Sequence, residues 1–159
     1  MKQQVATCFG VGRVPRMPGT AGAAVGVMIG AVSYSLGGVG ALVWAALVAI
    51  AAGFWATHQV EDAHDPPQVV IDEVAGQLIA LLPIPFLLHV SPSLEEMSLL
   101  GWLLAFVLFR LFDIWKPGII GKVDRRQRKG AVMLDDLLAG GFAAATLAAV
   151  GGIFVLSVG

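Results

Sequence analysis

The sequence predicts an all-α fold, a multi-span membrane helix bundle of about five apolar helices with polar clusters at its cytoplasmic face. Three observations predict it: 57% of the 159 residues are hydrophobic, only 13% are charged, and the mean hydropathy is +0.83. Soluble domains carry about 25% charged residues, so this composition is typical of a protein embedded in lipid. The length suits one domain, and residues 1–159 are expected to form a single integral-membrane domain.

Long charge-free stretches locate the helices. Residues 21–56 contain no charged residue and are too long for one span of about 20 residues, so Gly37 and Gly38 are expected to form a turn between two helices. A bend is expected in the third helix near Pro83 and Pro85. The expected helices are 21–36, 40–57, 74–90, 99–115 and 137–158.

Two further features concern packing. Gly22, Gly26 and Gly30 lie four residues apart, and small residues on one helical stripe allow a neighbouring helix to approach closely in lipid. That neighbour could belong to the same chain or to a second copy, so a homo-oligomer is left open. Cys8 is the single cysteine, which excludes an internal disulfide, and it is interpreted as a packing residue.

Basic residues lie on one side of this topology. Three precede the first helix and six lie between Lys116 and Lys129, whereas the loops 37–39 and 91–98 contain none. Lys and Arg accumulate in cytoplasmic loops, which predicts that the polar clusters face the cytoplasm. The net charge of −1 gives no reason to expect a nucleic-acid partner. The segments expected in the cytoplasm are 1–20, 58–73 and 116–134.

The block GVGRVPRMPGTAG, residues 10–22, is the first of four polar clusters at the predicted cytoplasmic helix ends. Its Gly and Pro residues indicate an irregular loop, and Thr20 is expected to cap the helix that follows. Free backbone N–H groups there, together with Arg13 and Arg16, would suit a phosphate. By itself, however, the block is also explained by a capped loop with two lipid-facing arginines.

The second cluster, residues 58–73, contains two histidines, five acids and no basic residue. Asp72 and Glu73 differ from the other acids because they directly precede an apolar run. On a helix they would diverge by about 100° and could not both face lipid. At least one should therefore face the bundle, where a metal or phosphate role is favoured. His58 lies four residues before Asp62, and a structural pair is the simpler interpretation of the two.

The third and fourth clusters lie at the ends of the last two predicted helices. In FRLFDIWKPG, residues 109–118, Arg110, Asp113 and Lys116 are spaced to place alternating charges on one helix face, either as an ion-pair ladder or as part of a site. In MLDDLLAGG, residues 133–141, Asp135 and Asp136 begin an apolar helix. The helix dipole explains one acid there, and two in succession favour a function.

Taken together, the clusters predict a metal-assisted phosphoryl-transfer site. Crowded carboxylates repel one another, and a divalent cation relieves that repulsion. All-oxygen ligands suit Mg²⁺ better than zinc. Arg110, Lys116, Arg13 and Arg16 in the same layer would bind a phosphate, with Thr20 beside them. In a membrane protein the substrate is then expected to be a phospholipid that enters sideways. The expected metal ligands are Asp72, Glu73, Asp113, Asp135 and Asp136.

Four blocks in this order resemble the bacterial phosphatidylglycerophosphatase A family: GVGRVPRMPGTAG, VIDEVAG at 70–76, FRLFDIWKPG and MLDDLLAG at 133–140. The family often has KPxP where this chain has Lys116-Pro117-Gly118-Ile119, and a glycine-rich block where it has RRQRKGAVML. The resemblance implies a Mg²⁺-dependent phosphatase of the bacterial inner membrane, which converts phosphatidylglycerophosphate to phosphatidylglycerol and inorganic phosphate.

The resemblance carries over to Asp72, Glu73, Asp113 and the Asp135–Asp136 pair, with Arg110 and Lys116 as phosphate partners. Water activated by the metal, or an aspartate itself, would attack phosphorus. His58 or another acid would protonate the leaving oxygen. Three alternatives remain: a different lipid-phosphate enzyme, although the chain lacks the motifs of the other lipid-phosphatase types; a membrane transporter that binds an ion with these acids; and a non-catalytic membrane scaffold in which acids and bases form ion pairs.

Overall fold

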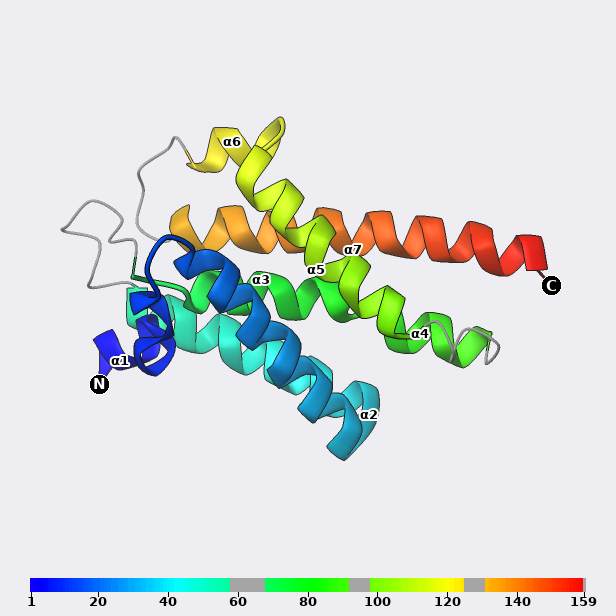
Figure 1. The fold of residues 1–159 in the computed structure, drawn as a ribbon, viewed down its shortest axis with the longest axis horizontal. Helices are drawn as coiled ribbons and strands as arrows, with labels where there is room; N and C mark the ends of the chain where they lie inside the picture. The colour runs from blue at the N-terminus through cyan, green and yellow to red at the C-terminus, as the bar shows by residue number, and fades with distance from the viewer. Residues whose placement is uncertain (58–67, 92–97, 125–130, 159) are drawn as a thin grey trace.

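A computed structural model describes residues 1–57, 68–91, 98–124 and 131–158, and within these ranges every regular element is helical. The predicted all-α fold is therefore confirmed. The elements are α1 (Lys2–Ala6), the 3₁₀ segment η1 (Cys8–Arg13), α2 (Pro18–Thr57), α3 (Ile71–Leu81), α4 (Pro83–Val90), α5 (Ser98–Trp115), α6 (Ile119–Asp124) and α7 (Ala131–Val158). In Figure 1, α3 and α7 run along the long axis of the bundle, while α2 and α5 run obliquely to it.

The helix α2 is a hairpin of two arms. Gly37 and Gly38 leave helical geometry inside it, and Gly38 has φ 61°, a conformation that glycine adopts without steric cost. The first arm runs to the turn and the second returns beside α3, as the blue and cyan segments of Figure 1 show. The predicted turn is confirmed. With α2 counted as two arms, the apolar segments agree with the expected number of about five.

The third predicted helix is divided into α3 and α4. Pro83 is the first residue of α4, where its missing N–H and fixed φ are tolerated, so the expected bend near the prolines is confirmed. The predicted start at residue 74 was too late, because α3 begins at Ile71. Asp72 and Glu73 therefore lie in the first turn of a helix, and their side chains diverge around it.

Two other predicted boundaries were wrong. The last helix begins at Ala131, not at residue 137, so Asp135 and Asp136 lie one turn inside α7 and do not begin it. Likewise α2 begins at Pro18, which places Thr20 inside its first turn and not at the capping position. Both errors have one cause: acids and small polar residues were interpreted as helix ends, whereas tertiary packing continues the helices through them.

The segment before α2 is more ordered than the predicted irregular loop. Residues Cys8, Phe9 and Gly10 have positive φ and turn the chain sharply within η1. The segment is fixed to the bundle at two points: the Val70 N–H donates to the Ala6 carbonyl oxygen at 2.9 Å, and Lys2 Nζ lies 5.2 Å from the centre of the Trp55 ring.

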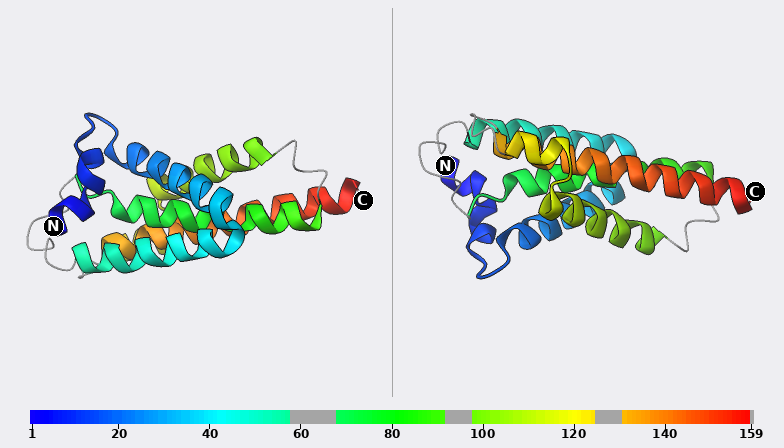
Figure 2. Two further views of the ribbon diagram at one scale, coloured as in Figure 1. Left: turned by 90° about the horizontal axis from the view of Figure 1, so that it is seen from below. Right: turned by 90° about the horizontal axis from the view of Figure 1, so that it is seen from above.

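The helix α3 lies at the centre of the bundle, between the two arms of α2 and against α5 and α7 (Figure 2). The glycine stripe of the first α2 arm faces it: a Cβ on Gly22 would meet Val70 and Glu73, and one on Gly26 would meet Gln77. The stripe therefore serves packing within one chain. The main core cluster is formed by Leu42, Ala46, Ala49, Ile71, Val74, Ala75, Leu78, Leu81, Ile84, Ala105, Met133 and Leu147.

The outer faces of the bundle are apolar. Side chains such as Trp44, Leu47, Leu103, Val107 and Ile153 are exposed, although large apolar side chains in water would oppose folding. Four helical stretches are long and apolar enough to cross a membrane: Pro18–Thr57, Ile71–Val90, Ser98–Trp115 and Val132–Ser157. These surfaces are those of a membrane protein. The starts of α2, α3 and α7 lie toward the same end of the bundle, together with α1 and η1 (Figure 1).

Candidate active site

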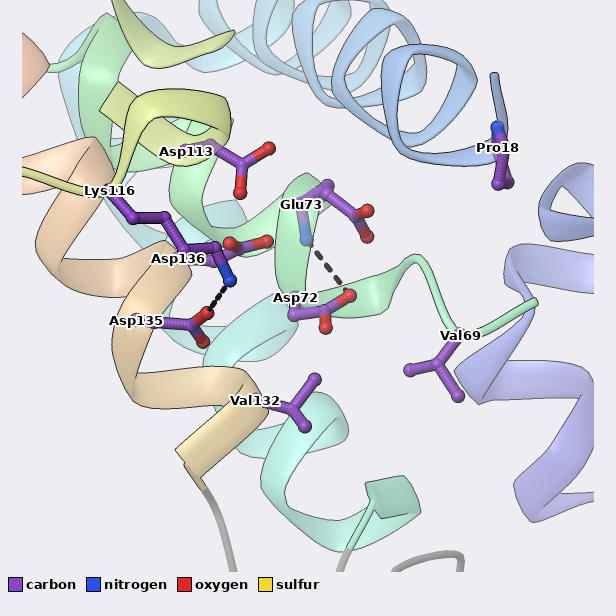
Figure 3. Close-up of a pocket in the computed structure, with 9 residues that line it drawn as sticks. All are labelled: Pro18, Val69, Asp72, Glu73, Asp113, Lys116, Val132, Asp135 and Asp136. Atoms are coloured by element: carbon purple, nitrogen blue, oxygen red, sulfur yellow. Dashed lines mark hydrogen bonds and ion pairs between the residues drawn. The ribbon is translucent and has the colours of Figure 1, made fainter. Parts of the chain in front are cut away.

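A polar cavity of about 160 Å³ opens at that end of the bundle. Four helices contribute to it, so residues far apart in the chain converge there, as Figure 3 shows. Five of its lining side chains are acids and one is a lysine. The lining residues are Pro18, Val69, Asp72, Glu73, Asp113, Lys116, Val132, Asp135 and Asp136.

The first turn of α3 supplies Asp72 and Glu73. Asp72 is 4% exposed, and its Oδ1 accepts a hydrogen bond from the Glu73 backbone N–H at 3.1 Å. Carboxylates are favoured at a helix N-terminus because backbone N–H groups there lack intrahelical partners. Glu73 turns toward α2, where a Cβ on Gly19 would collide with its Oε1. Gly19 is thus small because the glutamate carboxylate passes beside it.

The end of α5 supplies an ion pair and a lysine. Arg110 pairs through Nη1 with Asp113 Oδ2, one turn apart on the same helix, and both side chains are largely buried. Lys116 was expected to continue this face, but α5 ends at Trp115 and Lys116 has φ 44°. Its side chain instead reaches α7, where Nζ lies 2.5 Å from Asp135 Oδ2. Arg110 and Asp113 therefore pair within α5, whereas Lys116 pairs with an acid of α7.

The second turn of α7 supplies Asp135 and Asp136, each 4% exposed. Because they lie beyond the first turn, capping of the helix does not explain them. Their position depends on a close crossing with α3: a Cβ on Gly140 would collide with the Gly76 carbonyl oxygen, and one on Gly76 would lie 2.5 Å from the Asp136 carbonyl oxygen. Only glycine at both positions lets the two acid-bearing backbones approach this closely.

Three of these acids can share a cation. One carboxylate oxygen from each of Asp72, Glu73 and Asp136 lies within 4.8 Å of the other two. Mg²⁺ binds six oxygens at about 2.0–2.1 Å, which places its ligands about 3–4 Å apart, so small side-chain adjustments would complete such a site. The donors are all oxygens, which suits Mg²⁺ or Mn²⁺ and not zinc. Asp113 and Asp135 line the same cavity and already carry cationic partners.

Other residues predicted for the site lie elsewhere. Arg13 lines a second hollow of about 190 Å³, next to η1, with Gln3, Gln4, Thr7, Phe9 and Gly10. Arg16 is exposed and has φ 72°. Thr20 does not line the acidic cavity. His58 lies outside the described residues. The structure thus brings together the five predicted acids with Lys116 and Arg110, but Arg13, Arg16 and Thr20 of the first cluster do not line the cavity.

Two residues near the site, the buried Gln77 and the partly buried Cys8, were not predicted as parts of it. Gln77 is fully buried one turn beyond Glu73, and it is the one carboxamide in the apolar run 74–90, which is a signal that the sequence does contain. Cys8 packs against the main core cluster, as expected. Burial, and then the negative charges of Asp72 and Glu73, raise the pKa of its thiol from 9.0 to about 11.

Fold and site together define a membrane-embedded enzyme with an acidic, cation-flanked pocket at one end of a helix bundle. The family model described as phosphatidylglycerophosphatase A matches residues 4–151, which is nearly the whole chain. The chain belongs to this family.

Three relatives support the assignment. A Bacteroides thetaiotaomicron protein named as a candidate phosphatidylinositol-3-phosphatase is 39% identical over 86% of this chain and 84% of its own length. Phosphatidylglycerophosphatase A of Haemophilus influenzae is 36% identical over 85% of this chain and 79% of its own length. The Escherichia coli protein of the same name is 30% identical over 92% of this chain and 81% of its own length. No solved structure matches the chain.

Proposed function

We propose that this protein removes the terminal phosphate of phosphatidylglycerophosphate in a Mg²⁺-dependent reaction, giving phosphatidylglycerol and inorganic phosphate. The observation that carries the proposal is the convergence of five acids from three helices on one cavity, with Lys116 and Arg110 beside them. The matching family and the names of two relatives support the substrate. The positive-inside pattern supports a site at the cytoplasmic face of the inner membrane.

Asp72, Glu73 and Asp136 would hold the cation, and Asp113 and Asp135 line the remaining wall of the cavity. When bound, Mg²⁺ supplies Lewis-acid polarisation of the phosphoryl oxygens and neutralises their charge. The described lining of the cavity holds five acids and one lysine, with Arg110 paired beside them, so negative charge is in excess among these residues. This negative charge favours the binding of a divalent cation in the cavity.

Arg110 and Lys116 would bind the phosphate oxygens. The guanidinium of Arg110 presents a planar fork that matches two oxygens, and the Lys116 ammonium acts as a compact point charge. Their acid partners, Asp113 and Asp135, hold both cations at the cavity in the absence of substrate. As a water oxygen bonds to phosphorus and the bond from phosphorus to the glycerol oxygen breaks, these cations would stabilise the charge on the equatorial oxygens. The attacking water loses a proton and the glycerol oxygen gains one, so the products are phosphatidylglycerol and inorganic phosphate.

The position of the cavity suits a lipid. It lies at the end of the apolar spans, where a headgroup would be, while the exposed apolar faces contact the acyl chains. The substrate phosphate can thus reach the acids without the acyl chains leaving the bilayer. A water-soluble phosphate ester would gain nothing from this arrangement.

The test is phosphate release by the purified protein from phosphatidylglycerophosphate in detergent micelles, with added Mg²⁺ and with a chelator. We expect release with Mg²⁺, loss with the chelator and recovery when Mg²⁺ is restored. A transporter or a scaffold would release no phosphate under any of these conditions, and that result would refute the proposal. Release that persists at full rate in chelator would refute the metal dependence alone.

A phosphorylated inositol lipid is a second candidate substrate, because one relative at 39% identity is named for phosphatidylinositol-3-phosphate hydrolysis. Both lipids present a phosphomonoester at the headgroup, so the same acids and cations would act on either. Parallel assays at matched lipid concentration decide between them: the ratio of kcat/KM values shows which headgroup the site favours.

A further inference from the structure

Three buried side chains at the α2–α3–α5 junction leave hydrogen-bonding atoms without a partner among the described residues. These atoms are Glu73 Oε2, Arg110 Nε, and both Nε2 and Oε1 of Gln77. A buried polar group without a partner is destabilising and rare in folded proteins, so four such atoms in one region need an explanation. Two of the atoms are donors and two are acceptors, which is the composition of two complete hydrogen bonds.

The position of Gln77 brings it toward the other two residues. It is 0% exposed, and a Cβ on Gly26 would lie 2.8 Å from its Cβ and 3.0 Å from its Cγ, so its stem is held in the seam between α2 and α3. Side chains of a helix point back toward its N-terminus and cover the residue four positions earlier. For Gln77 that residue is Glu73, at the cavity.

Glu73 and Arg110 meet at the next glycine of the seam. A Cβ on Gly19 would contact Glu73 Oε1 and would lie 3.1 and 3.3 Å from the two Nη atoms of Arg110. The Glu73 carboxylate from α3 and the Arg110 guanidinium from α5 therefore lie close together, both beside Gly19 of α2. Arg110 donates a hydrogen bond from Nη1 to Asp113, and its buried Nε has no hydrogen-bond partner among the described residues.

We propose that Gln77 is a positioning residue that links Arg110 to Glu73. Its Oε1 accepts a hydrogen bond from Arg110 Nε–H, and its Nε2 donates one to Glu73 Oε2. The two bonds together satisfy all four atoms, and they require the Gln77 amide to extend along the seam from Gly26 toward Gly19, where Glu73 and Arg110 lie. The inference rests on the proposed function in one respect: it assigns Arg110 to the phosphate and Glu73 to the cation.

Through these two hydrogen bonds, Gln77 would orient both the Glu73 carboxylate and the Arg110 guanidinium. With Oε2 held by Gln77, Glu73 keeps Oε1 for the cation, and with Nε held, the Arg110 guanidinium is oriented in its plane. Groups that orient metal-ligating carboxylates typically change metal affinity or activity by about 10- to 100-fold when removed. A packing role alone predicts the opposite, because an apolar side chain of similar volume would remove the unsatisfied amide and leave the site unchanged.

The first measurement is Mn²⁺ binding, by electron paramagnetic resonance, to the purified full-length protein without substrate. We expect Gln77→Leu to weaken Mn²⁺ binding about 10- to 100-fold and to lower the melting temperature in detergent, because Arg110 Nε and Glu73 Oε2 lose their partner. Leu81→Met, one turn further along the same seam and facing Gly30, is the matched control and should bind Mn²⁺ as the parent does. Affinity within twofold of the parent in Gln77→Leu overturns the proposal.

The second measurement needs neither metal nor activity. Arg110→Lys keeps the positive charge but removes the Nε donor, so Gln77→Leu and Arg110→Lys should give non-additive shifts in melting temperature in the presence of a chelator. Leu81→Met combined with Arg110→Lys should be additive. Additive shifts in both pairs overturn the proposal. If the parent fails to bind Mn²⁺, the metal part of the proposed function fails. The double-mutant cycle of Gln77→Leu and Arg110→Lys still decides whether Gln77 is coupled to Arg110.

Discussion

Replacing Gly140 by alanine should reduce activity because it separates the two helices that carry the acids. An added Cβ would lie 2.9 Å from the Gly76 carbonyl carbon, 3.0 Å from its Cα and closer still to its oxygen, whereas ordinary contacts begin near 3.4 Å. The backbones of α3 and α7 must therefore part by at least about 0.5 Å, the limit within which catalytic groups must be held. Asp72 and Asp136 each lie one turn from this crossing, so the shift reaches both.

The expected loss is about 10- to 100-fold in phosphate release at saturating Mg²⁺, since a misplacement of about 1 Å costs roughly 100-fold. The crowding should also lower stability by about 1–3 kcal/mol, visible as a lower melting temperature. Gly141→Ala is the matched control: its Cβ would meet nothing within 4 Å, so activity should be unchanged. A folded Gly140→Ala protein with activity within twofold of the parent would refute the reasoning.

Neutralising Asp113 or Asp136 as asparagine should abolish turnover while the protein still elutes as a folded species in detergent; unchanged phosphate release would remove that residue from the site. Lys116→Gln should lower both activity and melting temperature because it removes the positive charge beside the buried Asp135 carboxylate, whereas Lys122→Gln, at an exposed position, should change neither in the same assays. Because burial raises the pKa of Cys8 from 9.0 to about 11, its thiolate fraction at pH 8 should be about 100-fold below that of an ordinary thiol. Its rate of maleimide labelling should thus rise about tenfold per pH unit up to pH 10, and a plateau near pH 9 would contradict the shift.

The fold class and the composition of the site could be predicted from the sequence because lipid imposes strong rules. Charge-free stretches must be helical, and charges at their ends must be paired or functional. The turn at Gly37 and Gly38 and the bend at Pro83 followed from backbone chemistry alone. The convergence of Asp72, Glu73 and Asp136 followed from their common depth at the ends of separate helices, which requires no knowledge of packing.

What could not be predicted depends on contacts between helices. The direction of Lys116 is set by its left-handed backbone and by Asp135 on another helix, neither of which periodicity reveals. The absence of Arg13 from the acidic cavity depends on a sharp turn at Cys8 and Phe9, residues that rarely adopt positive φ. Local sequence therefore identifies the candidate residues of the site, and the tertiary fold determines which of them line the same cavity.

The central place of α3 has a consequence for how the protein is made. In the stretch Ile71–Val90, 61% of the most apolar 18-residue window is buried inside the protein, whereas the same share is at most 28% in the other spans. This stretch also carries two acids and a glutamine, so it is the span least able to partition into lipid by itself. The α2 hairpin is synthesised immediately before it and offers the glycine-lined surface that α3 needs. We therefore expect stable membrane insertion of α3 to depend on the prior insertion of the α2 hairpin, although that hairpin contributes only Pro18 to the described lining of the acidic cavity.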